Sequence, residues 1–95
     1  MLIYTGKKIN VRKDEVLLED GRKVTREVIE HPGSAAIIPF LSDDEIILLQ
    51  QYRYPMKETL YEIPAGTLDK GETFIACAGR EMEEETGYRA GTLEP

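Results

Sequence analysis

The stretch from Gly66 to Tyr88 reads GTLDKGETFIACAGREMEEETGY, and its pattern decides how the rest of the chain is interpreted. Thr73 precedes apolar residues with a four-residue repeat, and Gly87 follows them. A threonine hydroxyl caps free backbone N–H groups, and glycine tolerates the left-handed conformation at a helix end. The pattern therefore predicts a helix that begins near Thr73 and ends at Gly87. Its predicted core face is the apolar row Phe74, Ile75, Ala78 and Met82.

Four glutamates crowd the end of this helix, in the run Arg80-Glu81-Met82-Glu83-Glu84-Glu85. Like charges three or four residues apart repel each other by roughly 0.2–0.5 kcal/mol per pair. At the helical angle per residue, Glu81 and Glu85 share one line, with Glu84 beside it. Glu83 points away from the core face. Two interpretations remain open: a solvated face in which Arg80 pairs with Glu84, or a site for a divalent cation, which prefers oxygen ligands.

A fifth glutamate, Glu72, lies just before the helix, and Arg80 lies two turns into it. An ion pair between Glu72 and Arg80 would fasten the loop to the helix. Such a pair would also orient the acidic side chains as a supporting shell.

The spacing of these residues resembles the Nudix box, G-x5-E-x7-R-E-U-x-E-E-x-G-U, in which U is a bulky apolar residue. The fixed positions are matched by Gly66, Glu72, Arg80, Glu81, Glu84, Glu85 and Gly87. Met82 fits the first apolar position, and Tyr88 is an aromatic departure at the last. The resemblance implies an α+β protein, a truncated Nudix fold of the α/β/α sandwich kind with an N-terminal antiparallel sheet. It also implies hydrolysis of a nucleoside diphosphate linked to another moiety, with Mg²⁺ or Mn²⁺ as cofactor.

The resemblance implies two overlapping sets of site residues. The metal ligands are the carbonyl of Ala65 and the carboxylates of Glu81, Glu84 and Glu85. The catalytic residues are Glu72, Arg80, Glu84 and Glu85. Within them Glu72 and Arg80 form the orienting pair, and Glu84 is either a further ligand or a group that positions water.

Segments outside the box resemble ADP-ribose pyrophosphatases: Thr25–Gly33, Gln51–Pro55 and Tyr61–Gly66. The resemblance implies that ADP-ribose, or a related nucleoside diphosphate sugar, is cleaved to AMP and a sugar phosphate. Arg53 and Arg26 are expected to bind substrate, because a guanidinium suits bidentate contact with phosphate. Two alternatives stay open: a Nudix hydrolase for another nucleotide, or a catalytically incomplete fragment that binds nucleotide or dimerises.

The first third of the chain predicts β structure. Strand-like stretches lie within Leu2–Val11 and Glu15–Glu19, and the strands expected after them are Val24–Ile29, Glu45–Tyr52 and Leu60–Ile63, with another from Tyr88 onward. Asp20-Gly21 predicts a type I′ hairpin, and the apolar run Ile46–Leu49 suits a strand covered on both faces. We expect residues 1–33 to be an antiparallel region and residues 34–95 a partial Nudix core, with the box at 66–88. The resemblance implies that the first region forms a homodimer by exchanging strands.

Composition limits which classes of binding partner and which cellular location the chain is expected to have. The net charge of −6 argues against nucleic acid, because phosphate neutralisation needs clustered Lys and Arg. No apolar run approaches the length of about 20 residues that a membrane span needs, and the single cysteine, Cys77, excludes an internal disulfide. These features predict a cytoplasmic protein. The resemblance also places a further glutamate, as general base or metal ligand, beyond Pro95, so we expect an N-terminal portion of a longer protein.

Overall fold

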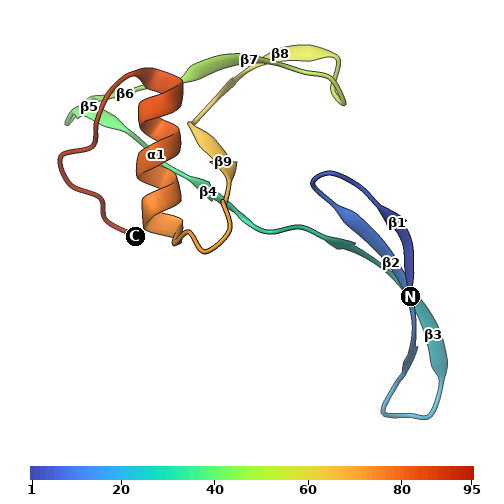
Figure 1. The fold of residues 1–95 in the computed structure, drawn as a ribbon. Helices are drawn as coiled ribbons and strands as arrows, with labels where there is room; N and C mark the ends of the chain where they lie inside the picture. The colour runs from blue at the N-terminus through green and yellow to red at the C-terminus, as the bar shows by residue number, and fades with distance from the viewer. The chain divides into compact units, whose positions relative to one another are not determined.

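The fold is described for residues 1–95 in a computed structural model. The chain separates into two compact units, Met1–Pro32 and Gly33–Pro95, and each is described by itself (Figure 1). Every paired strand is antiparallel, and there is one helix. That helix is not long and apolar enough to cross a membrane.

The first unit is a three-stranded sheet in the order β1-β2-β3. Its strands are β1 (Leu2–Thr5), β2 (Asn10–Leu17) and β3 (Lys23–Glu30). The β structure expected over Leu2–Val11 is divided between two strands. The chain turns after Thr5, where the Gly6 N–H donates to the carbonyl of Ile9 at 2.7 Å, so this stretch supplies two strands that pair with each other.

The hairpin between β2 and β3 is present, but its turn is not the expected type I′. That turn needs positive φ at both central residues, whereas Gly21 has φ +89° and Asp20 has no positive φ. The Gly21 N–H donates to the carbonyl of Leu18 at 3.0 Å, and the Leu18 N–H donates to the carbonyl of Arg22 at 2.8 Å. This is the three-residue loop in which a type I turn is followed by a left-handed glycine bulge.

The second unit contains three two-stranded sheets and the helix α1. The sheets pair β4 (Ser34–Ala36) with β9 (Ala65–Thr67), β5 (Phe40–Ser42) with β6 (Glu45–Ile46), and β7 (Leu49–Arg53) with β8 (Glu58–Glu62). Helix α1 (Phe74–Thr86) packs against β4 and β9, as Figure 1 shows. Its predicted ends are confirmed: the Thr73 side chain accepts a hydrogen bond from the Ala76 N–H, and Gly87 is left-handed with φ 79°.

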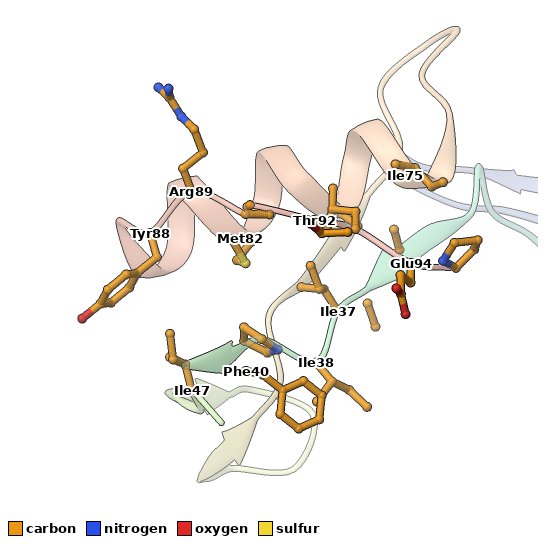
Figure 2. Close-up of a pocket in the computed structure, with 18 of the residues that line it drawn as sticks. Ile37, Ile38, Phe40, Ile47, Ile75, Met82, Tyr88, Arg89, Thr92 and Glu94 are labelled. Carbon is orange, nitrogen blue, oxygen red and sulfur yellow. The ribbon is translucent and has the colours of Figure 1, made fainter. Parts of the chain in front are cut away.

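The buried residues of the second unit only partly match the predicted core face. Cys77 is fully buried and Met82 is 4% exposed, but Phe74 is 61% exposed. Phe74 and its neighbour Ile75 instead line an open cavity of about 870 Å³. Figure 2 shows the apolar side chains around it, among them Ile37, Ile38, Phe40, Ile47 and Met82. The helical period correctly identified an apolar row on α1. The face of α1 that β4 and β9 cover, however, is centred closer to Cys77 than that row is.

Two expected strands differ in the structure. The stretch Glu45–Tyr52 is split between β6 and β7, and Leu48 between them is 49% exposed, so the expected cover on both faces is wrong. The reason is that β6 pairs only with the three-residue strand β5. No strand follows Tyr88: the terminal segment runs back alongside α1 and pairs with no strand (Figure 1). There Leu93 packs so close to Gly79 that a Cβ on Gly79 would lie 3.2 Å from its Cδ1.

Candidate active site

Arg80 on α1 forms a two-pronged ion pair with Glu72 in the loop before the helix. Its Nε donates to Glu72 Oε2 at 2.8 Å, and its Nη2 donates to Glu72 Oε1 at 2.9 Å. The Glu72 side chain is only 13% exposed. Paired donors matched to both carboxylate oxygens hold the two groups in one plane and add directional strength. The pair expected from the sequence is therefore present, and it fastens the loop to the helix.

Backbone groups of the same loop complete this arrangement. The Asp69 N–H donates to Glu72 Oε1 at 3.0 Å, and Arg80 Nη2 donates to the Thr67 carbonyl at 3.3 Å. Hydrogen bonds from the Arg80 side chain, followed by the Asp69 backbone, lower the pKa of Glu72 to about 2. Glu72 is therefore a carboxylate through the whole physiological pH range.

We predict an acid-sensitive contribution of Glu72 to stability. Because its folded pKa lies below its unfolded value, this contribution is complete above about pH 4.5 and is lost as the pH falls toward 2. In Glu72→Gln, unfolding between pH 5 and pH 2 should take up about one proton fewer than in the wild type, which flattens the pH dependence of unfolding free energy. Urea unfolding across that range measures it, with the exposed Glu83→Gln as control. Equal pH slopes for wild type and Glu72→Gln would contradict the prediction.

Glu81 and Glu84 share the remaining nitrogen of Arg80. Nη1 donates to Glu81 at 2.9 Å and to Glu84 at 3.2 Å. The Glu81 side chain is 15% exposed, whereas Glu84 is 58% exposed. Glu83 is exposed and lies 3.6 Å from Arg89, on the solvated side where the helical period placed it. One arginine thus compensates several carboxylates of the cluster.

Glu85 meets Glu81 one turn along the helix. Burial and then a hydrogen bond and charge repulsion from Glu81 raise the pKa of Glu85. A backbone hydrogen bond from Ala65 and the charge of Arg53 oppose that rise. The Glu81 and Glu85 carboxyl groups are therefore neighbours, both only partly exposed, next to the backbone of β9. Two such groups so close favour a shared proton or a cation between them.

Gly66 on β9 makes this placement of Glu81 sterically possible. A Cβ added at Gly66 would lie 2.0 Å from the carboxyl carbon of Glu81 and 2.2 Å from its Oε1. No side chain can occupy that space while Glu81 stays where it is. The glycine is needed for close approach, and its φ is not in the left-handed range.

The two arginines expected to bind substrate lie in different units. Arg53 lies at the end of β7 in the second unit, where its Nε donates to Glu62 Oε2 at 2.8 Å and its charge acts on Glu85. Arg26 lies on β3 in the first unit, exposed, and its Nη1 donates to the carbonyl of Thr25 at 3.3 Å. The structure thus brings Arg53, but not Arg26, together with the carboxylates within one unit.

The fold and the arrangement of these residues agree with a match to a known protein family. Residues 30–95 match the NUDIX domain family. The chain belongs to the NUDIX domain family. It is 43% identical over 91 residues to the ADP-ribose pyrophosphatase of Bacillus subtilis, with 96% of this chain and 49% of that protein covered. It is 40% identical over 92 residues to the methanol dehydrogenase activator of Bacillus methanolicus, covering 97% of this chain and 50% of that protein.

The fold of this Nudix chain also matches a solved structure. A crystal structure of an ADP compounds hydrolase superposes with a TM-score of 0.81 at 23% identity, over 97% of this chain and 50% of that one. The expected partial Nudix fold is therefore confirmed, with antiparallel strands and a single helix. The chain spans about half the length of the curated relatives named above.

The donor set of the Nudix box suits a hard divalent cation. The neighbouring carboxylates of Glu81 and Glu85 are oxygen ligands of the kind that Mg²⁺ prefers, and the backbone of Ala65 lies beside Glu85. Glu84 contacts Arg80, and no group of three or more acidic, His or Cys side chains is arranged to hold a metal. The structure thus brings together two of the three carboxylates expected as ligands, and the metal roles of Ala65, Glu81, Glu84 and Glu85 stay predictions.

Three contributors to the site were not identified from the sequence: the Glu62 side chain, the Thr67 carbonyl and the Cys77 thiol. Cys77 Sγ lies 3.5 Å from the Gly66 carbonyl and 3.8 Å from Arg80 Nη2. Burial, followed by the neighbouring Glu72, raises the pKa of the Cys77 thiol, so it stays neutral. The sequence pattern of β8 indicated that Glu62 lies on the same face of the strand as Glu58, because side chains alternate between the two faces of a strand. The Thr67 carbonyl and the Cys77 contacts depend on packing that the sequence pattern does not encode.

Proposed function

We propose that this protein hydrolyses the pyrophosphate bond of ADP-ribose or a related nucleoside diphosphate sugar, giving AMP and a sugar phosphate. The observation that carries the proposal is the Glu81–Glu85 pair, seated over Gly66 and oriented through Arg80 by Glu72. The resemblance to the B. subtilis ADP-ribose pyrophosphatase supports the substrate class. An ADP-sugar pyrophosphatase of Mus musculus, 35% identical over 98% of this chain and 48% of that protein, supports it further.

In this proposal the residues of the Nudix box have different roles. A Mg²⁺ or Mn²⁺ ion held by Glu81, Glu85 and the carbonyl of Ala65 would neutralise charge on the pyrophosphate. Glu72 fixes Arg80, and Arg80 in turn fixes the carboxylate of Glu81. Glu84, the most exposed of Arg80's partners on the helix, is free to move to a further ligand position or to orient water.

Binding of the substrate falls to Arg53 in this proposal. Its guanidinium lies at the end of β7, close enough to Glu85 for each to shift the pKa of the other. A planar cation beside the carboxylate pair suits a phosphate oxygen of the same pyrophosphate. Arg26 is proposed as a second substrate contact.

We further propose a cytoplasmic homodimer formed through the first unit. Its sheet exposes large apolar side chains, with Ile29 68%, Ile3 53% and Leu2 49% exposed. Apolar surface of this kind on a small sheet favours a protein partner. The net charge of −6 supports the absence of nucleic-acid partners.

The proposed function is tested by incubating the 95-residue chain with ADP-ribose and Mg²⁺ and measuring AMP release. Mg²⁺-dependent AMP formation, abolished by EDTA, is the expected result. Hydrolysis of another nucleoside diphosphate in place of ADP-ribose would identify a Nudix hydrolase of different substrate. Nucleotide binding without turnover would instead identify a catalytically incomplete binding fragment.

A further inference from the structure

The partner of Arg53 is not the residue that lies opposite it. In the β7–β8 ladder Arg53 pairs in register with Glu58, and Glu62 is opposite Leu49. Directly opposed residues are the usual cross-strand ion pair. The Arg53 side chain nevertheless runs along the hairpin to Glu62, where Nε donates at 3.0 and 2.8 Å to the two carboxylate oxygens. Nη2 makes a third hydrogen bond, to Glu62 Oε1.

This contact sets where the charge of Arg53 is placed. Glu62 ends β8, three residues before Ala65, whose backbone bonds the Glu85 carboxyl group. By binding Nε and Nη2, Glu62 holds the guanidinium at the end of the hairpin that leads into this backbone. Glu62 is also the less exposed partner, with a side chain 23% exposed against 48% for Arg53. In this position the hydrogen bonds to Glu62, and to a lesser degree the attraction between the charges of Arg53 and Glu85, raise the pKa of Arg53.

The contact also leaves part of the guanidinium available. A guanidinium has five N–H donors, and Glu62 uses those on Nε and Nη2. The Nη1 group of Arg53 makes no hydrogen bond in the structure. An arginine whose guanidinium is hydrogen-bonded along one edge keeps its other N–H donors available for an anionic ligand.

We infer that Glu62 is a positioning residue, which holds Arg53 so that its free Nη1 donors meet a phosphate group of the substrate beside the Glu81–Glu85 pair. The inference rests on the proposed function, because it assigns the phosphate of that same substrate to Arg53. It differs from a competitive contact, in which Glu62 would have to release Arg53 before substrate binds.

Steady-state kinetics with ADP-ribose and Mg²⁺ distinguish a positioning role of Glu62 from a competitive contact. Glu62→Gln is expected to raise KM about tenfold, the scale on which supporting partners act, with a much smaller change in kcat. Glu58→Gln is the matched control, since Glu58 lies on the same strand and face and makes no hydrogen bond to Arg53. In an Arg53→Gln background, Glu62→Gln should have no further effect on KM, because its action passes through Arg53. An unchanged or lowered KM, or full additivity with Arg53→Gln, would overturn the inference.

A second measurement does not depend on turnover. The Nε–H signal of Arg53 in a ¹H–¹⁵N spectrum, assigned by its loss in Arg53→Lys, is expected to exchange slowly in wild type and Glu58→Gln. It should broaden or disappear in Glu62→Gln. An Arg53 signal that is indifferent to Glu62→Gln refutes the positioning role, whatever the activity of the chain. A wild type that forms no AMP while the signal responds to Glu62→Gln refutes the proposed function, and with it the assignment of a substrate phosphate to Arg53.

Discussion

Replacing Glu85 by glutamine is expected to lower kcat for ADP-ribose hydrolysis by about a thousandfold, the scale of removing one pre-organised electrostatic group from an active site. Glutamine keeps the size of the side chain but removes the charge that a divalent cation needs. The fold should persist, since neutralising Glu85 also removes its repulsion with Glu81. The raised pKa of Glu85 gives the sign: its ionised form costs stability, so Glu85→Gln should unfold at the same or a higher temperature at neutral pH.

Steady-state kinetics and a thermal melt of the same samples test this expectation. Glu83→Gln is the matched control, because Glu83 lies on the same helix but is exposed and paired only with Arg89 at 3.6 Å. The control should keep kcat within a factor of about two, as for an ordinary surface substitution. Equal turnover by Glu85→Gln and Glu83→Gln would remove Glu85 from the catalytic machinery.

The second large effect is expected for Gly66→Ala. The added methyl would lie 2.0 Å from the carboxyl carbon of Glu81, far inside van der Waals contact. The Glu81 side chain is flexible, so its carboxylate moves before the backbone does, and its contacts with Arg80 and Glu85 are lost. A displacement of about 1 Å in such a site can cost a hundredfold in rate, and kcat/KM should fall by about that factor.

The control for this substitution is Gly91→Ala. A Cβ at Gly91 meets no atom within 4 Å, and the φ of Gly91 is not left-handed. Its kcat/KM should therefore stay at the wild-type value. If Gly66→Ala kept full activity with a normal melting temperature, the close approach of Glu81 to β9 would not be needed for function.

The parts of the fold that the sequence predicted well are those fixed by neighbours along the chain. Thr73 and Gly87 end the helix through contacts within four residues, so their chemistry identifies both ends. The Glu72–Arg80 pair likewise joins a loop to the helix that follows it. Convergence of Glu81 and Glu85 follows from helical geometry alone.

Other features depend on which segments pack together, and the sequence did not predict them. The pairing of Arg53 with Glu62 rather than Glu58 depends on how side chains run along a hairpin whose register is set by long-range pairing. The need for glycine at position 66 depends on β9 packing against α1. The type of the β2–β3 turn depends on which strand residues pair, and a single Asp-Gly signal fits more than one loop length.

The exposed apolar residues explain why two strands were predicted wrongly. A run such as Ile46–Leu49 predicts burial from composition, but burial requires another layer to cover it. In the structure Ile46 is 45% and Leu48 is 49% exposed, and the segment from Tyr88 pairs with no strand. Local patterns indicate the propensity for a strand, whereas its partners are a property of the packed fold.

The most direct measurement for the central claim is Mn²⁺ binding by calorimetry, without nucleotide, to wild type, Glu81→Gln and Glu83→Gln. The claim is that Glu81 and Glu85 form a divalent-cation site seated over Gly66 and oriented by the Glu72–Arg80 pair. Wild type and Glu83→Gln should bind Mn²⁺ with the same affinity, and Glu81→Gln should bind at least about tenfold more weakly. Equal Mn²⁺ affinity in all three proteins, or no binding to the wild type, would contradict the claim.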